Sequence, residues 1–137
     1  MNEFETIDID YNRCQFQYIF EYENDSNFQT VHFRVFSIPA NKTRWFLYSF
    51  RLIDNHTAKG EMVTNNGYVE FAKKGIPEKI IEIASIVLNR KIISSPIEPQ
   101  AGDYLVGPSY KAWLRLVEIN NRARLNEVDG YFEFNIS

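Results

Sequence analysis

Cysteine, histidine and long apolar runs are scarce in this chain of 137 residues, and each scarcity excludes a class of protein. The single cysteine, Cys14, excludes an internal disulfide and a metal site built from cysteines, and it favours a reducing, cytoplasmic setting. The two histidines, His32 and His56, have no carboxylate pattern beside them that would indicate a metal site. No apolar run approaches the roughly 20 residues of a membrane-spanning helix, and the acidic first residues do not resemble a secretion signal. The sequence therefore predicts a cytoplasmic protein without a membrane segment.

Positive charge is also in short supply, with 15 Lys and Arg against 18 Asp and Glu and a net charge of -3. This balance opposes a broadly basic nucleic-acid surface, although it does not exclude a local basic patch. Aromatic residues, in contrast, make up 15% of the chain, and they favour strands over a helical bundle. The length suits one domain with its own core, covering residues 1–137.

The first half of the chain alternates between apolar and polar residues, which is the period of a half-buried strand. Strands are predicted at residues 5–11, 14–23, 29–38 and 43–54. Four aromatic residues share one face of the second of these: Phe16, Tyr18, Phe20 and Tyr22. We interpret this stripe as core-facing, rather than as a partner surface or a platform for stacking bases. The aromatic segment 43–54 is predicted to be the centre of the sheet, with both faces covered.

The second half changes character at residues 67–96, where a helical period first appears. The pattern predicts a strand at 68–71, a turn at 72–75, a helix at 77–89 and a strand at 91–94. Pro77 suits the first turn of a helix because it lacks an N–H group that would have no internal partner. A loop at 96–108, a second helix opening at Pro108 and a last strand at 131–136 complete the chain. The predicted class is α+β, with a mixed, mainly antiparallel sheet and two helices in the C-terminal half.

This order of elements, together with the turn before the first helix, resembles the GNAT superfamily of N-acetyltransferases over residues 43–137. In that family the turn carries Gln/Arg-x-x-Gly-x-Gly/Ala, and its backbone amides hold the pyrophosphate of acetyl-CoA. The matching run here is Ala72-Lys73-Lys74-Gly75-Ile76-Pro77. Gly75 fits the first glycine, whereas Ala72 replaces the Gln/Arg and Pro77 replaces the second small residue. The proline removes one amide donor but leaves the helix dipole.

The resemblance implies a binding site for acetyl-CoA around the turn and the following strand. Its expected members are Lys73, Lys74, Gly75, Ile76, Glu78, Lys79, Ile93 and Ser94. Amides at a helix N-terminus bind phosphate, and the lysines would add point charges to replace the lost donor. The competing interpretation is a turn with solvated lysines at an ordinary helix start.

The resemblance also implies a catalytic acid on the second helix, where the family places a tyrosine. Leu114 stands at that position and cannot carry a proton, so Tyr110, one turn earlier, is the candidate. Glu70, on the predicted strand before the turn, is the candidate general base, and Asp54 is a second choice. Both carboxylates are equally typical of solvated strand ends.

Two functions follow from these observations. The first is an acyl-CoA-binding domain that passes an acyl group to an amine. The second is a small acidic interaction protein, such as an immunity protein or an inhibitor, that keeps the fold without the chemistry and meets a protein partner through complementary charge. A nucleic-acid ligand is opposed by the net charge, and a homodimer remains open.

Overall fold

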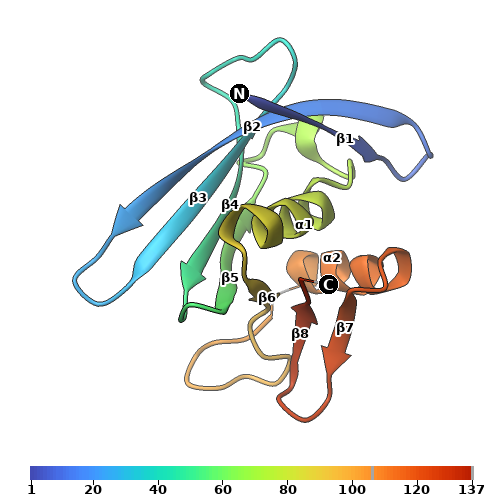
Figure 1. The fold of residues 1–137 in the computed structure, drawn as a ribbon. Helices are drawn as coiled ribbons and strands as arrows, with labels where there is room; N and C mark the ends of the chain where they lie inside the picture. Colours follow the sequence, from blue (N-terminus) through green and yellow to red (C-terminus); the bar gives the residue numbers. More distant parts are fainter. Residues whose placement is uncertain (106, 137) are drawn as a thin grey trace.

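The computed structural model describes residues 1–105 and 107–136 (Figure 1). The strands are β1 (Asn2–Ile7), β2 (Arg13–Asn24), β3 (Gln29–Phe36), β4 (Phe46–Leu52), β5 (Thr57–Thr64), β6 (Lys91–Ile93), β7 (Ala123–Asn126) and β8 (Tyr131–Phe134). The helices are α1 (Ile76–Leu88), α2 (Gly107–Ile119) and a short 3₁₀ helix, η1 (Val69–Phe71). The strands form one sheet in the order β1-β2-β3-β4-β5-β6-β8-β7, in which β5 and β6 are parallel and the other neighbours antiparallel. The α+β class predicted from the sequence is therefore confirmed.

Three residues of the aromatic stripe of β2 face the core as predicted (Phe16, Tyr18 and Phe20), whereas Tyr22 is 50% exposed. Strands β2 and β3 pair as a hairpin. The first strand was placed wrongly at residues 5–11, because β1 runs from Asn2 to Ile7. The chain turns directly after it: Asp8 Oδ1 accepts the N–H groups of Asp10 (2.9 Å) and Asn12 (2.8 Å). An aspartate that bonds the backbone two residues ahead ends a strand, and this turn overrides the alternation of Ile7 and Ile9.

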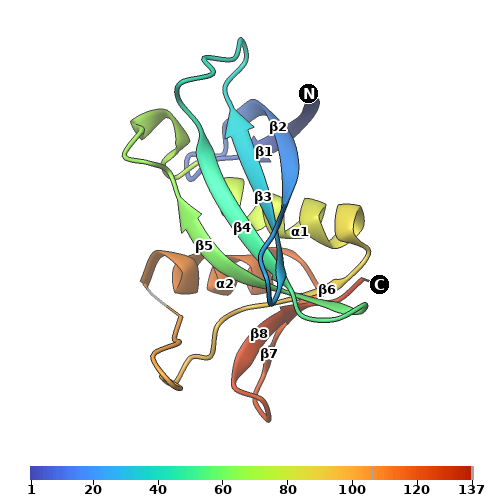
Figure 2. The same ribbon diagram turned by 90° about the vertical axis from the view of Figure 1, so that its left-hand side faces the viewer.

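Both long helices lie on one side of the sheet, and Figure 2 looks onto the opposite face of β3–β5. Phe46, Tyr48 and Phe50 point to the helix side and are buried. The prediction that both faces of this central strand are covered was wrong, because Leu47 and Arg51 remain partly exposed on the other face. There Arg51 pairs with Glu61 of β5 at 3.0 Å, so the outer face is closed by polar contacts rather than by a second layer.

The segment predicted as a strand at residues 68–71 contains η1 instead. Asn66 (φ 55°) and Gly67 (φ 78°) adopt left-handed backbone angles, which turn the chain away from β5 before a new strand can pair. The short helix exposes Val69 (80% exposed) and buries Phe71 (2% exposed). The strand beside β6 is therefore β5.

Helix α1 begins one residue before the predicted start and ends one residue before the predicted end. Gly75 is its N-cap residue and Asn89 its C-cap residue, both in the left-handed region. A Cβ on Gly75 would lie 2.8 Å from the carbonyl oxygen of Ile7, so only glycine allows β1 to approach the helix so closely. The apolar face of the helix fills the core with Ile76, Ile80, Ile81, Ala84 and Leu88.

The C-terminal strands differ in one respect from the expectation. The last strand is β8, and it lies between β6 and β7, a strand that the sequence analysis missed because the four residues of Ala-Arg-Leu-Asn are too few to establish a period. Helix α2 packs Trp113 against Phe132 of β8, with the rings stacked 5.9 Å apart. Within the two described ranges, no helix has the length and apolar character needed to cross a membrane.

Candidate functional site

The parallel strands β5 and β6 separate after a short pairing and leave a fork in the sheet. They pair only from Thr57–Lys91 to Lys59–Ile93, whereas β5 continues to Thr64. Residues 60–64 therefore have a strand, β4, along one edge only. The β4–β5 register also shifts between Ser49 and Phe50, where β5 carries an extra residue. Such a bulge bends a strand, and here it turns β5 away from β6.

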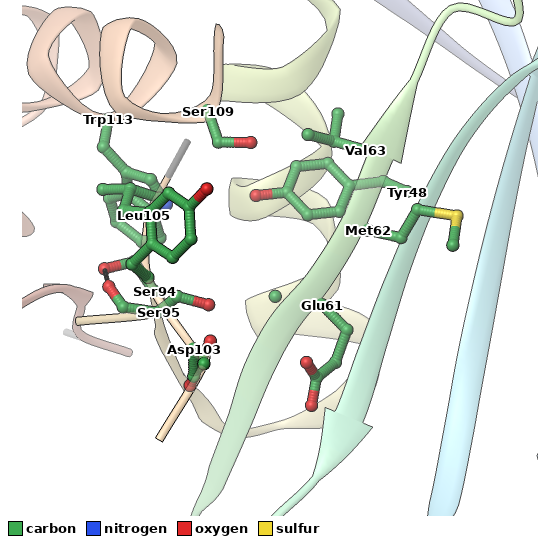
Figure 3. A pocket seen from close by; sticks show the side chains of 13 residues that line it. Tyr48, Glu61, Met62, Val63, Ser94, Ser95, Asp103, Leu105, Ser109 and Trp113 are labelled. Carbon is green, nitrogen blue, oxygen red and sulfur yellow. Dashed lines mark hydrogen bonds between the residues drawn. The ribbon is translucent and has the colours of Figure 1, made fainter. Parts of the chain in front are cut away.

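A cavity of about 220 Å³ fills this fork. In Figure 3, Tyr48 and Val63 form one wall, while Leu105 and Trp113 lie across from them. The loop between β6 and α2 lines the cavity with residues 102–105. An ion pair between Lys59 of β5 and Asp103 holds this loop across the fork.

A second and larger cavity, of about 710 Å³, lies between the N-termini of α1 and α2. It shares Tyr48, Val63 and Ser109 with the fork cavity, so the two spaces adjoin. Apolar side chains make up much of its wall: Ile9, Phe46, Phe71, Ala72, Pro77 and Ala112. Together the two cavities offer adjoining spaces beside a helix N-terminus, of which the larger has a mostly apolar wall.

Cationic side chains line the larger cavity from two elements. Lys73 and Lys74 come from the turn before α1, and Lys111 and Arg115 come from successive turns of α2. Their charges add to the positive end of the α1 dipole, which makes this end of the cavity attractive to an anion. Among residues 1–105 and 107–136, no group of three His, Cys, Asp or Glu side chains is arranged to hold a metal ion.

One acidic side chain, Glu78, sits in the same place. It occupies the third position of α1, lines the larger cavity and is only 8% exposed. Its Oε2 atom is buried without a hydrogen-bond partner, and so is the hydroxyl of Thr6 on β1. Burial raises the pKa of the Glu78 carboxyl, while the nearby Arg115 charge opposes this shift. The N-terminus of α1 therefore already has an acidic group of its own.

The structure brings together only part of the predicted acetyl-CoA site. Lys73, Lys74, Gly75 and Glu78 line the larger cavity as a group. Ile76 is fully buried in the core, and Lys79 pairs with Glu82 (3.5 Å), outside the lining of both cavities.

The strand residues of the predicted site are used by the sheet itself. Ser94 lines the fork cavity, but its N–H donates to the Phe132 carbonyl (2.9 Å) and its hydroxyl accepts the Phe132 N–H (3.0 Å). The Ser94 hydroxyl in turn donates to the Ser95 carbonyl (2.7 Å). Ile93 pairs with Lys59 on one side and Glu133 on the other. The Ser94 backbone N–H is consequently occupied by its bond to β8 and is not free to polarise the carbonyl of a bound thioester.

Neither predicted catalytic residue belongs to the lining of either cavity. Glu70 accepts two hydrogen bonds from Arg44, at 2.6 Å and 2.8 Å, and this pairing lowers its pKa to about 2. A carboxylate with so low a pKa is a poor base near neutral pH. Tyr110 packs edge-on against Phe132 at 5.7 Å between ring centres, and the second-choice base, Asp54, has its pKa lowered by the His56 N–H.

The sequence analysis missed the residues that α2 and β4 contribute to the site. Lys111 and Arg115 are four residues apart, a spacing that places both on one helix face, and this signal was readable. Tyr48 gave no such signal, because in an aromatic strand it looks like any core residue. Burial raises the pKa of its hydroxyl, which therefore stays protonated at neutral pH.

The Glu70–Arg44 pair carries a testable pH dependence. Because the folded-state pKa of Glu70 lies below the ordinary value of 4.5, the pair stabilises the fold fully above that value and loses this effect as pH falls toward about 2. We expect the unfolding temperature of the wild type to drop more steeply over this range than that of Glu70→Gln. Thermal unfolding followed by circular dichroism measures both slopes, and equal slopes would contradict the assignment.

Comparison of the chain with protein families, with curated protein sequences and with solved structures finds no match.

Proposed function

We propose that this chain binds an acyl-CoA thioester such as acetyl-CoA, in the manner of the GNAT superfamily that its element order resembles. The observation that carries the proposal is the fork between β5 and β6, which opens beside a basic helix N-terminus. A ligand that combines anionic phosphates with a less polar thioester arm matches a space whose wall combines cationic and apolar side chains.

Different residues of the chain would contact the phosphate end and the thioester end of such a ligand. Lys73, Lys74, Lys111 and Arg115 would hold the phosphates, and the walls formed by Val63 and Trp113 would enclose the thioester arm. The departures are Pro77, which lacks an amide donor, and the Glu78 carboxyl, which is an acidic group like the phosphates of the ligand. The residues thus fit the ligand in shape and at the rim of the cavity, with one anionic group that must be accommodated.

Acyl transfer to an amine is the reaction such a ligand would support. In this reaction the amine attacks the thioester carbonyl, so that a C–N bond forms and the C–S bond breaks. A base removes the proton that the amine loses, and the departing CoA thiolate takes up a proton to leave as the free thiol. Glu70 and Tyr110 do not line either cavity, so we assign neither of them a role in proton transfer.

A second candidate function is favoured by the position of Glu70 and Tyr110 outside both cavities. A chain that keeps the fork but ties Glu70 to Arg44 and packs Tyr110 against Phe132 suits an interaction protein without chemistry. In this case we expect a protein partner to bind this chain with the same stoichiometry and affinity whether or not acetyl-CoA is present.

Isothermal titration calorimetry with acetyl-CoA tests the first proposal. We expect saturable binding of one ligand per chain, together with a rise in unfolding temperature, because a ligand that binds only the folded state stabilises it. Acetyl-pantetheine, which has the arm without the nucleotide phosphates, is the matched ligand and should bind more weakly. An absence of both heat and thermal protection at millimolar acetyl-CoA would refute acyl-CoA binding.

A further inference from the structure

The carboxyl of Glu78 is an unexplained feature of the larger cavity. Its Oε2 atom is buried without a partner, although buried polar atoms nearly always have one. Both Glu78 and Thr6 lie beside Gly75. A Cβ added to this glycine would be 3.8 Å from Glu78 Oε2 and 3.7 Å from the Cβ of Thr6. Of the described part of the chain, these two residues hold the buried side-chain polar atoms that lack a partner, and they meet at the start of α1.

Charged and titratable groups lie on the elements that surround this carboxyl. At the end of β1, the Ile7 carbonyl accepts a hydrogen bond from Arg115 Nη2 of α2 at 3.5 Å. Tyr48 of β4 lies near enough for the charge of Glu78 to raise the pKa of the Tyr48 hydroxyl. The turn contributes Lys73 and Lys74, and α2 also contributes Lys111. The further acidic group nearby is Asp8, whose own pKa is lowered by the backbone N–H of Asn12.

These positions create a competition for the same donors. A phosphate at the N-terminus of α1 needs the helix dipole, the first N–H groups and the cations at the rim. The Glu78 carboxylate already lies at that end of the dipole. Two anions in one partly desolvated site repel each other, and the usual resolution is that one of them takes up a proton.

We propose that Glu78 is a specificity-determining residue that holds the anion position of this cavity, so that the phosphate groups of the ligand enter only as Glu78 takes up a proton. This inference rests on the acyl-CoA proposal and adds to it a coupling between ligand binding and protonation. The raised pKa of the buried carboxyl agrees with it, since a proton is then taken up at little cost. The affinity for CoA should therefore rise as pH falls toward the pKa of Glu78.

Calorimetry of CoA binding to the wild type and to Glu78→Gln tests this coupling. The titration is run near neutral pH in two buffers of different ionisation enthalpy, which gives the number of protons exchanged on binding. We expect the wild type to take up about one proton more per CoA than Glu78→Gln does. Because glutamine keeps the shape without the charge, we also expect the variant to bind about tenfold more tightly and to lose most of the pH dependence.

Glu82→Gln is the matched control, since Glu82 lies one turn further along α1, outside the cavity lining, and pairs with Lys79. It should bind CoA with the affinity and proton uptake of the wild type. Weaker binding by Glu78→Gln, or an unchanged proton count, would overturn the role of Glu78 while leaving acyl-CoA binding intact. No heat from the wild type, from Glu78→Gln or at lower pH would instead refute acyl-CoA binding itself.

Discussion

Replacing Gly75 by alanine is expected to lower the free energy of unfolding by about 2–4 kcal/mol, as the sum of a backbone strain and a collision. The backbone of Gly75 has φ 78°, which costs any other residue energy. In addition, the new Cβ would lie 2.8 Å from the backbone oxygen of Ile7, and a backbone oxygen cannot move aside as a side chain can. Urea denaturation followed by fluorescence measures the loss.

Gly67→Ala separates these two contributions. Gly67 has the same φ of 78°, but no atom lies within 4 Å of its absent Cβ. This variant should therefore pay only the conformational cost, about 1 kcal/mol. If both variants lost the same amount, the close approach of β1 to α1 would have no energetic weight.

Reversing the charge of Lys73 and Lys74 together is expected to weaken acetyl-CoA binding about 100-fold, the largest effect that we predict for the site. Both side chains line the larger cavity at the dipole end of α1, where each lost cation is replaced by a repelling anion. The remaining affinity should also depend less on salt, because fewer ion pairs form on binding. Calorimetry at two salt concentrations measures both effects.

Lys79→Glu is the control for this pair. It reverses one charge within α1, close in sequence to the pair, but Lys79 pairs with Glu82 and does not line the cavity. Its affinity should stay within about threefold of the wild type, because exposed charges at a distance are screened. Binding of acetyl-pantetheine should be unaffected in both lysine variants. An equal loss for Lys79→Glu would show that net charge, rather than the cavity, determines the affinity.

Much of the fold could be predicted because its signals are local. The alternation in β2 and the Pro77 start of α1 each depend on residues close in sequence, and both elements were found with boundaries shifted by a residue or so. The errors arose where side chains override a pattern. Asp8 ends β1 through hydrogen bonds to the following backbone, and the left-handed angles of Asn66 and Gly67 turn residues 68–71 out of the sheet.

The candidate site was harder to predict because it depends on contacts between distant segments. The turn at Lys73–Lys74 could be found from its resemblance to a phosphate-binding turn. That Glu70 would be taken by Arg44, 26 residues earlier, had no local signal. Nor could the sequence show that Glu78, on a helix start where an exposed glutamate is ordinary, would be covered by the end of β1.

The early parting of β5 from β6 has a consequence for self-association. A strand with one unpaired side normally lies at the rim of a sheet, where it invites another chain to add a strand and begin aggregation. Here the unpaired side of β5 faces inward, beneath the loop that the Lys59–Asp103 ion pair holds in place and beside α2. The unpaired backbone of β5 at residues 60–64 can therefore admit a narrow ligand while it excludes a strand from another chain.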